Sequence, residues 1–149
     1  MLEVGAVAPD FTGTAADGST FSLGSLRGRP VVLFFYPKAN STGCRIETRG
    51  FVEHFDDFAS KGVALVGVSV DPVEAQKRFA EACRVPFPLV SDRDGAIARQ
   101  YGVLGWLGLA QRVTFLLDAQ GRILWVVRGL RPGPHLQGSL AHLATLPGP

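Results

Sequence analysis

Short unbroken runs of apolar residues alternate along this chain with segments whose apolar residues recur at helical spacing. Residues 31–36 (VVLFFY) and 63–70 (VALVGVSV) are almost wholly apolar, which is typical of strands buried on both faces of a sheet. Between these runs, Phe51, Phe55 and Phe58 form one apolar stripe, as expected for a helix that packs one side on the sheet. The order predicts a strand–helix–strand unit.

Polar residues indicate where the helices begin and end. Ser41 follows a polar turn, and we expect it to cap the first helix, which residues 61–62 (Lys-Gly) close. In the next helix Asp71 is the expected cap and Pro72 suits the first helical position. Glu74 would complete a capping box with Asp71.

The remaining elements follow from the same patterns. Asp17-Gly18 between two short β-prone runs predicts a hairpin near the N-terminus. The other predictions are a helix with Ala75, Phe79, Ala82 and Cys83 on its inner side, a strand at 87–90, a brief helix from Asp94 to Gly102, strands at 113–117 and 123–127 joined by a tight turn, and a last helix from Pro134 to about Leu146. The fold class is therefore α/β: a sandwich with a central mixed sheet flanked by helices and an N-terminal β-hairpin.

Composition narrows the classes of protein. With 149 residues, 46% of them hydrophobic and 19% charged, the chain is expected to form one domain over residues 1–149. A net charge of +2 argues against a nucleic-acid partner. No apolar run approaches the ~20 residues of a spanning helix, so we expect no membrane segment, and no signal peptide is recognisable. Because the chain has only two cysteines, a disulfide framework is not expected, and a cytoplasmic location is the default.

Cys44 is the first candidate for chemistry. It follows the strand at 31–36 and a polar turn, so it lies in the first turn of the predicted helix. A thiol attacks electrophiles only as the thiolate, and a helix N-terminus favours an anion. The alternative interpretation is that Cys44 is a small buried residue of the core.

Five segments carry a resemblance to a known family. Residues 35–44 (FYPKANSTGC) resemble the active-site signature of the peroxiredoxins, most closely that of the bacterioferritin-comigratory-protein (Q) subfamily. The other matching segments are 8–11 (APDF), 87–92 (FPLVSD), 112–118 (RVTFLLD) and 134–135 (PH). The resemblance implies a thioredoxin-like fold and the reduction of hydroperoxides to alcohols or water, usually at the expense of thioredoxin.

The resemblance also implies roles for individual residues. Cys44 is the expected peroxidatic cysteine, which attacks the peroxide in line and becomes a sulfenic acid. A helix dipole alone stabilises an anion by only ~0.3–1 kcal/mol, so a guanidinium is needed, and Arg112 is at the matching position. Ser41 is expected to hydrogen-bond the peroxide, Pro37 to shield the thiolate from water, and Glu47 to orient the arginine.

Each of these residues also has a structural interpretation. Arg112, directly before a strand, could be a surface charge, and Glu47 could belong to a solvated helix face. Trp106 lies in the apolar loop 105–110 and could cover the pocket or simply pack, and packing is the expectation. This loop is shorter than in typical relatives, which leaves the preferred substrate size open. Neither metal nor cofactor is expected, because His54, His135 and His142 lack ligand spacing.

The second thiol departs from the resemblance. Many relatives have a resolving cysteine five residues after the peroxidatic one, and this chain has Arg49 there. Cys83 lies in the next predicted helix, about one turn later than other relatives place theirs. It is either the resolving cysteine, which requires partial unwinding of a helix to bring the two Cα atoms within ~7 Å, or a buried core thiol.

The sequence therefore predicts a thiol-dependent peroxidase for hydrogen peroxide and small organic hydroperoxides, a monomer or weak dimer recycled by thioredoxin or a similar dithiol. One alternative is a one-cysteine enzyme reduced by an external thiol. Another is a redox sensor or binding module in which oxidation of Cys44 changes a contact with a partner. A general thiol–disulfide oxidoreductase is disfavoured because the chain has no C-x-x-C motif.

Overall fold

A computed structural model describes residues 1–146. Seven strands form one mixed sheet in the order β2-β1-β5-β4-β3-β6-β7. The strands are β1 (Thr12–Ala15), β2 (Thr20–Ser22), β3 (Val31–Phe35), β4 (Ala64–Ser69), β5 (Leu89–Ser91), β6 (Val113–Leu117) and β7 (Ile123–Arg128). The helices are the 3-10 helix η1 (Leu23–Leu26), α1 (Thr42–Glu53), α2 (Phe55–Ser60), α3 (Val73–Cys83), α4 (Ala96–Gln100) and α5 (Gly133–Leu143).

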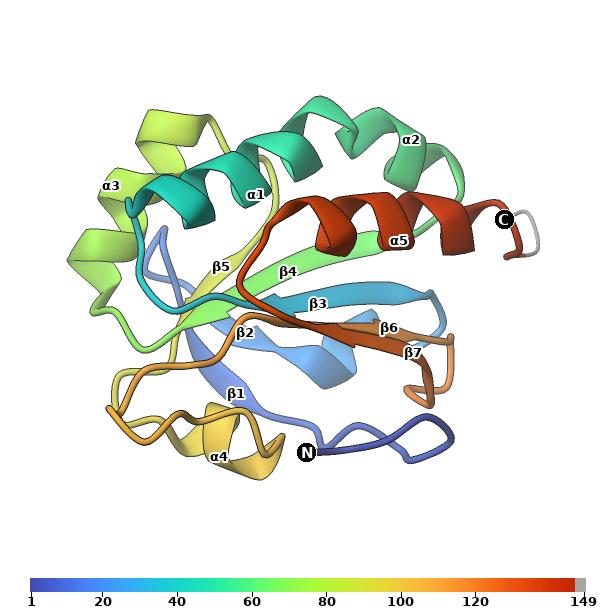
Figure 1. Ribbon diagram of the computed structural model, residues 1–149, viewed down its shortest axis with the longest axis horizontal. Coiled ribbons are helices and arrows are strands. Elements are labelled where there is room, and N and C mark those ends of the chain that lie inside the picture. Colours follow the sequence, from blue (N-terminus) through green and yellow to red (C-terminus); the bar gives the residue numbers. More distant parts are fainter. Residues whose placement is uncertain (147–149) are drawn as a thin grey trace.

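The two sides of the sheet are covered unequally. Helices α1, α2, α3 and α5 cover one face, and α4 with the N-terminal segment lies on the other (Figure 1). The predicted hairpins are confirmed, since β1 pairs antiparallel with β2 and β6 with β7. Strands β3 and β4 are parallel neighbours, as expected of a strand–helix–strand unit.

Strand β3 lies at the centre because its side chains are buried on both faces. Val31, Leu33 and Phe35 belong to the core under α4, whereas Val32 and Phe34 belong to the core under the four-helix layer. Alternate residues of a strand point to opposite faces, so an unbroken apolar run serves two cores at once.

The predicted single helix after Cys44 is wrong in one respect. It breaks at His54 into α1 and α2, and the break separates the expected stripe of phenylalanines. Phe51 and Phe58 are fully buried with ring centroids 5.9 Å apart. Phe55 is only partly buried and stacks on Phe87, at a centroid distance of 6.4 Å. Helical spacing therefore identified the inward side but not the break.

The capping box predicted for α3 is also wrong. The cap residue is Pro72, without a side-chain cap hydrogen bond, and Glu74 is exposed. The Asp71 carboxylate instead accepts hydrogen bonds from the Ala39 N–H at 2.7 Å and from the Ser69 hydroxyl at 2.6 Å. Asp71 therefore fastens the turn before α1 to the end of β4, which is a long-range function that local sequence patterns do not reveal.

One buried face and one helix boundary differ from the predictions in smaller ways. Ala82 is exposed rather than on the inner side of α3, where Gln76, Phe79 and Cys83 are the buried residues. Helix α5 ends at Leu143, before the predicted Leu146.

The pairing of β3 with β6 brings two distant segments together. These strands are antiparallel neighbours, and Phe35 is opposite Val113. The residue after the C-terminal end of β3 and the residue before the N-terminal end of β6 are therefore adjacent. As a result Arg112 lies beside the Tyr36-Pro37 turn that leads into α1.

Candidate active site

Cys44 lies in the first turn of α1 and has no exposed surface. Its Sγ atom accepts a hydrogen bond from Arg112 Nη2 at 3.2 Å. The first backbone N–H groups of a helix have no partner within the helix and carry a partial positive charge. The sulfur is therefore near both a guanidinium and the positive end of a helix.

Arg112 is held by three hydrogen bonds, one from each nitrogen of its guanidinium group. Its Nη1 donates to Glu47 Oε1 at 2.5 Å, its Nη2 to Cys44 Sγ, and its Nε to the Leu130 carbonyl at 2.9 Å. Only 6% of the residue is exposed, so the interpretation as a surface charge is wrong. A guanidinium fixed at all of its nitrogens presents a defined direction to the sulfur.

Glu47 follows Cys44 by one helical turn and lies on the same inward side of α1. It is 1% exposed, so the interpretation as part of a solvated helix face is wrong. Burial raises the pKa of Glu47 to about 7, although the charge and hydrogen bond of Arg112 act to lower it. Its Oε2 atom has no hydrogen-bond partner among the described residues.

Pro37 and Ser41 both lie in the turn that leads into α1. Ser41 is the cap residue of α1 by position, but its hydroxyl donates to the Lys38 carbonyl at 2.8 Å instead of capping the helix. Asn40 has a φ of 64°, a left-handed conformation that asparagine tolerates better than most residues. Pro37 is half-buried and lines the same pocket as Arg112.

Gly43 allows the arginine to lie close to the helix. A Cβ atom at this position would be 3.0 Å from Arg112 Nη2. Any larger residue would force the guanidinium to move, so the close approach of Arg112 to the first turn depends on glycine here.

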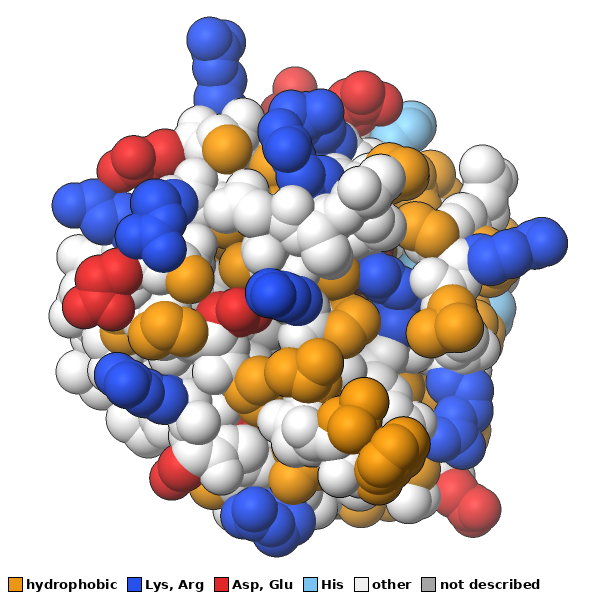
Figure 2. Space-filling model, turned by 60° about the vertical axis from the view of Figure 1, so that its left-hand side comes forward, with side chains coloured by type: hydrophobic (Ala, Val, Ile, Leu, Met, Phe, Trp, Pro, Cys, Tyr) orange, Lys and Arg blue, Asp and Glu red, His pale blue; other side chains and the backbone are white. Residues whose placement is uncertain are grey.

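A cleft of about 470 Å³ opens over Arg112. Pro37, residues 105–107, residues 109–111 and residues 128–130 contribute to its wall. Trp106 is 93% exposed, so the expectation that it packs is wrong, and Leu130 is 85% exposed. Hydrophobic side chains gather low on the face drawn in Figure 2, which looks onto the left-hand side of Figure 1. The cleft thus combines an apolar rim with a cationic floor.

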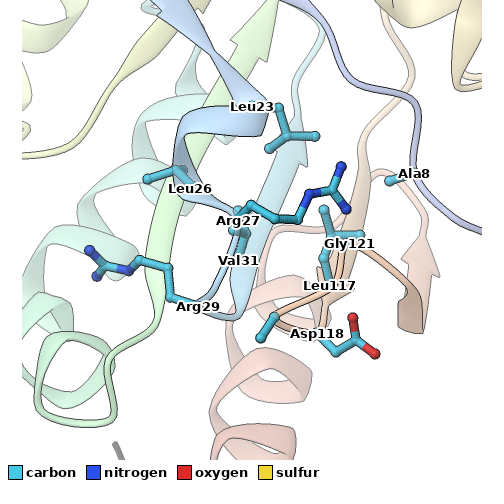
Figure 3. Close-up of a pocket in the computed structure, with 10 residues that line it drawn as sticks. Ala8, Leu23, Leu26, Arg27, Arg29, Val31, Leu117, Asp118 and Gly121 are labelled. Carbon is cyan, nitrogen blue, oxygen red and sulfur yellow. The ribbon is translucent and has the colours of Figure 1, made fainter.

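A second hollow, at the opposite end of β3, differs from this cleft. It measures about 10 Å³ and is lined by Val31 and the loops around it (Figure 3). Its two arginines are already engaged with backbone, Arg27 with the Gln120 carbonyl and Arg29 with the Gly62 carbonyl. A space of this size holds about one water at most, so it offers no substrate site.

Cys83 is the last residue of α3 and is 5% exposed. It belongs to the same apolar core as Cys44, and both thiols are free. Helices α1 and α3 pack side by side on one face of the sheet (Figure 1). The two thiols therefore lie in the same layer of the molecule. Cys44 is at the N-terminal end of its helix, whereas Cys83 is at the C-terminal end of its helix.

His135 is a residue of this site that the sequence reasoning missed. Its spacing from the other histidines excludes a metal site and indicates no further role, yet its ring is fully buried with Nδ1 3.7 Å from Glu47 Oε2. Its place in segment 134–135, which resembles the family, is the one signal that could have identified it.

Trp125 is half-buried and stacks on His142, with ring centroids 4.7 Å apart.

Within residues 1–146, no cluster of three or more His, Cys, Asp or Glu side chains could hold a metal ion. None of the helices in this part of the chain is both long and apolar enough to cross a membrane.

Comparison with known proteins identifies the family. Residues 4–126 match the AhpC/TSA family. The putative peroxiredoxin bcp of Coxiella burnetii is 35% identical over 150 residues, covering 95% of this chain and 96% of its own. Peroxiredoxin Bcp of Escherichia coli (strain K12) is 34% identical, with 90% of each chain covered. The crystal structure of peroxidoxin BcpB from Mycobacterium tuberculosis superposes with a TM-score of 0.93 at 36% identity, covering 99% of this chain and 100% of that one.

The chain therefore belongs to the AhpC/TSA family. Its relatives place it among the Bcp/peroxiredoxin Q peroxiredoxins, and it is a thiol-dependent peroxidase, an oxidoreductase. The thioredoxin-like α/β sandwich predicted from the sequence is confirmed.

Proposed function

We propose that Cys44 is the peroxidatic residue and that the protein reduces hydrogen peroxide and small organic hydroperoxides. The observation that carries the proposal is the 3.2 Å contact between Arg112 Nη2 and Cys44 Sγ, beside a cleft wide enough for a small substrate. The Cys44 thiolate attacks the terminal oxygen of ROOH, the O–O bond breaks, and Cys44 sulfenic acid and RO⁻ form. A proton taken up by RO⁻ completes the alcohol, or water where R is hydrogen.

Arg112 has two tasks in this proposal. Its positive charge stabilises the thiolate before attack, and its Nη2 donor can follow the charge that develops on the departing oxygen. Glu47 orients the guanidinium by holding Nη1 at 2.5 Å. Ser41 is half-buried and three residues before Cys44, and its hydroxyl can rotate away from the Lys38 carbonyl to meet the peroxide. Pro37 covers the site without presenting an N–H.

The apolar rim of the cleft supports organic hydroperoxides as substrates. Trp106 and Leu130 would otherwise face only water. A related structure, that of the Xanthomonas campestris bacterioferritin comigratory protein, is described in terms of its alkyl peroxide reduction activity, at 30% identity and a TM-score of 0.87, with 97% of each chain covered.

We further propose that Cys83 resolves the sulfenic acid as a disulfide that thioredoxin or a similar dithiol reduces. Cys83 is in the last turn of α3, and Arg84 after it is left-handed. A last turn opens at the loss of few hydrogen bonds, so the movement needed to reach Cys44 is less costly there than in mid-helix. The alternative is a one-cysteine cycle, which the burial of Cys83 in the core favours.

The setting we propose is a single domain that acts in the cytoplasm as a monomer or weak dimer, with no nucleic-acid partner. The net charge of +2 supports the last point. The relatives include peroxiredoxin Bcp of Escherichia coli and plant proteins named as chloroplastic peroxiredoxin Q.

Coupled turnover tests the proposed activity. Peroxide consumption is followed by NADPH oxidation with thioredoxin and thioredoxin reductase, for the wild type and for Cys44→Ser. Many equivalents of peroxide consumed by the wild type, and none above background by the variant, support the enzyme. Oxidation that stops after a single equivalent would favour the redox sensor instead.

Disulfide mapping tests Cys83 separately. The protein is treated with one equivalent of peroxide, digested and analysed by mass spectrometry. A Cys44–Cys83 disulfide supports the resolving role, and overoxidation of Cys44 should then increase in Cys83→Ser. Cys44 found only as sulfenic acid or mixed disulfide, with Cys83 free, assigns the one-cysteine cycle.

A further inference from the structure

His135 is fully buried, and each of its two ring nitrogens has a hydrogen-bond partner. Nε2 lies 2.9 Å from the Gly129 carbonyl and Nδ1 lies 2.8 Å from the Thr114 hydroxyl. A carbonyl oxygen only accepts, so Nε2 carries a hydrogen and donates it. Burial, together with the nearby charge of Arg112, lowers the pKa of His135 and favours the neutral ring. Nδ1 then accepts from Thr114.

The ring also closes the space around Glu47. Nδ1 is 3.7 Å from Glu47 Oε2, which has no hydrogen-bond partner among the described residues, while Oε1 accepts from Arg112. A cation in place of the neutral ring would compete with Arg112 for the carboxylate. The neutral imidazole instead excludes water from Oε2 and leaves the charge of Glu47 directed toward Arg112.

A second connection runs through the turn between β7 and α5. His135 donates to the Gly129 carbonyl, the Gly129 N–H donates to the Arg112 carbonyl at 3.2 Å, and Arg112 Nε donates to the Leu130 carbonyl. One ring therefore contacts Glu47 and also the turn that supplies the other anchor of the guanidinium.

The unpartnered Glu47 Oε2 lowers the stability of the fold, so stability alone does not explain why this arrangement is present. A buried carboxylate oxygen without a hydrogen bond destabilises a fold. Such sites are expected where function constrains the side chains.

We propose that His135 is a positioning residue of the peroxidase site. It fixes Glu47 on one side and the Gly129-Leu130 turn on the other, and through them it keeps Arg112 directed at Cys44. It touches no reacting atom. The inference rests on the proposed roles of Cys44 and Arg112.

The test measures the second-order rate constant for oxidation of Cys44 by hydrogen peroxide, in single turnover with thiol trapping, on the full-length protein. His135→Phe keeps a ring but removes both hydrogen bonds, and His135→Gln keeps an amide that can donate toward Gly129. The matched control is His142→Phe, the same change two turns later on α5, where His142 contacts Gly138 and Trp125. Circular dichroism and thermal unfolding check the fold of each variant.

We expect His135→Phe to lower the rate constant about tenfold, because small displacements of a catalytic group are costly. His135→Gln should recover part of the loss, and His142→Phe should stay within about twofold of the wild type. In an Arg112→Met background His135→Phe should have no further effect on the rate, since its action passes through Arg112. A purely structural role predicts equal losses in both backgrounds.

Two results would overturn the inference: a His135→Phe rate within about twofold of the wild type, or equal fold-losses with and without Arg112. If His135→Phe does not fold, His135→Gln takes its place in the same cycle under the same criteria. A wild type that consumes no peroxide, or a Cys44→Ser variant that is as active as the wild type, contradicts the proposed function instead, so the two failures are distinguishable.

Discussion

Cys44 and Cys83 are two buried thiols in one apolar core, and they differ in almost everything else. Cys44 is 0% exposed and Cys83 is 5% exposed, so accessibility does not separate them. Cys44 is hydrogen-bonded by Arg112 beside an open cleft. Cys83 has no hydrogen bond to a side chain among the described residues. The neighbours of a thiol, and not its exposure, distinguish the candidate nucleophile.

The ends of the two helices add to this difference. Cys44 lies in the first turn of α1 and Cys83 at the last residue of α3. A helix attracts anions at its N-terminus and cations at its C-terminus. The same backbone therefore supports an attacking thiolate at one cysteine and gives no such support at the other.

The largest expected effect comes from exchanging each thiol for a hydroxyl. Cys44→Ser should lower peroxide turnover by at least about a thousandfold, because a serine hydroxyl is not ionised near neutral pH. Cys83→Ser should leave the first oxidation of Cys44 within about threefold of the wild type. Stopped-flow oxidation kinetics measure both rates. A Cys83→Ser loss as large as that of Cys44→Ser would reverse the proposed roles of the two thiols.

Removing the cation should make Cys44 resemble Cys83. Arg112→Met is expected to lower the rate constant for oxidation of Cys44 by about a hundredfold or more, as for other donors that stabilise developing charge. Arg112→Lys should not restore the rate, because a lysine cannot satisfy Cys44, Glu47 and the Leu130 carbonyl at once. Arg131→Met, a change at an exposed arginine, is the control. An active Arg112→Met variant would contradict the comparison.

Glu47 is expected to leave a pH signature on the Cys44 side of the molecule. The pKa of Glu47 rises from 4.5 to about 7 because of burial, so the folded protein holds a proton that the unfolded chain releases. The stabilisation is complete below pH 4.5 and is lost as the pH rises through about 7.

Glu47→Gln should therefore gain stability relative to the wild type over this pH range, by at most about 3 kcal/mol, since one pKa unit corresponds to about 1.4 kcal/mol. Denaturant unfolding of both proteins at about pH 5 and about pH 8 measures the change. Glu53→Gln, at an exposed residue of the same helix, should show no such trend, and a pH-independent Glu47→Gln difference would argue against a raised pKa.

A smaller effect is expected from a change at Gly43, which tests how closely Arg112 must approach the first turn of α1. Gly43→Ala places a methyl group 3.0 Å from Arg112 Nη2, so the guanidinium must shift from Cys44. We expect an approximately tenfold lower oxidation rate with little loss of stability, because alanine favours helix. Thr42→Ala, at the exposed neighbouring residue, is the control. Equal rates for the two variants would show that the arginine tolerates the shift.

The smallest expected effect concerns the cleft over Arg112. Trp106→Ala should lower the rate with an aromatic hydroperoxide such as cumene hydroperoxide by roughly threefold, since less apolar surface is buried with it. The rate with hydrogen peroxide should not change. Leu124→Ala, at a 40%-exposed leucine on β7, is the control. An equal loss of rate with both peroxides would contradict a role of the apolar rim in substrate recognition.

Several features of the molecule were determined by the sequence alone. The apolar run of β3, the two hairpins and the position of Cys44 at the start of a helix follow from periodicity and turn residues within short windows. Local patterns of this kind are informative because the side-chain periodicity of a strand or a helix is visible within a short window of sequence. The family resemblance, which runs through most of the chain, also named Arg112 and Glu47 as candidates.

Only the tertiary structure decided what these residues contact. Arg112 meets Cys44 because β3 and β6 pair in one particular register, and Glu47 is buried because His135 on α5 closes the space beside it. Asp71 binds the Ala39 N–H instead of capping α3. Each contact joins segments more than about 30 residues apart, and its free energy depends on burial and charge that no local window contains. The sequence places a thiol on a helix, whereas the packing of β6 and α5 against that helix supplies its cation and holds it in place.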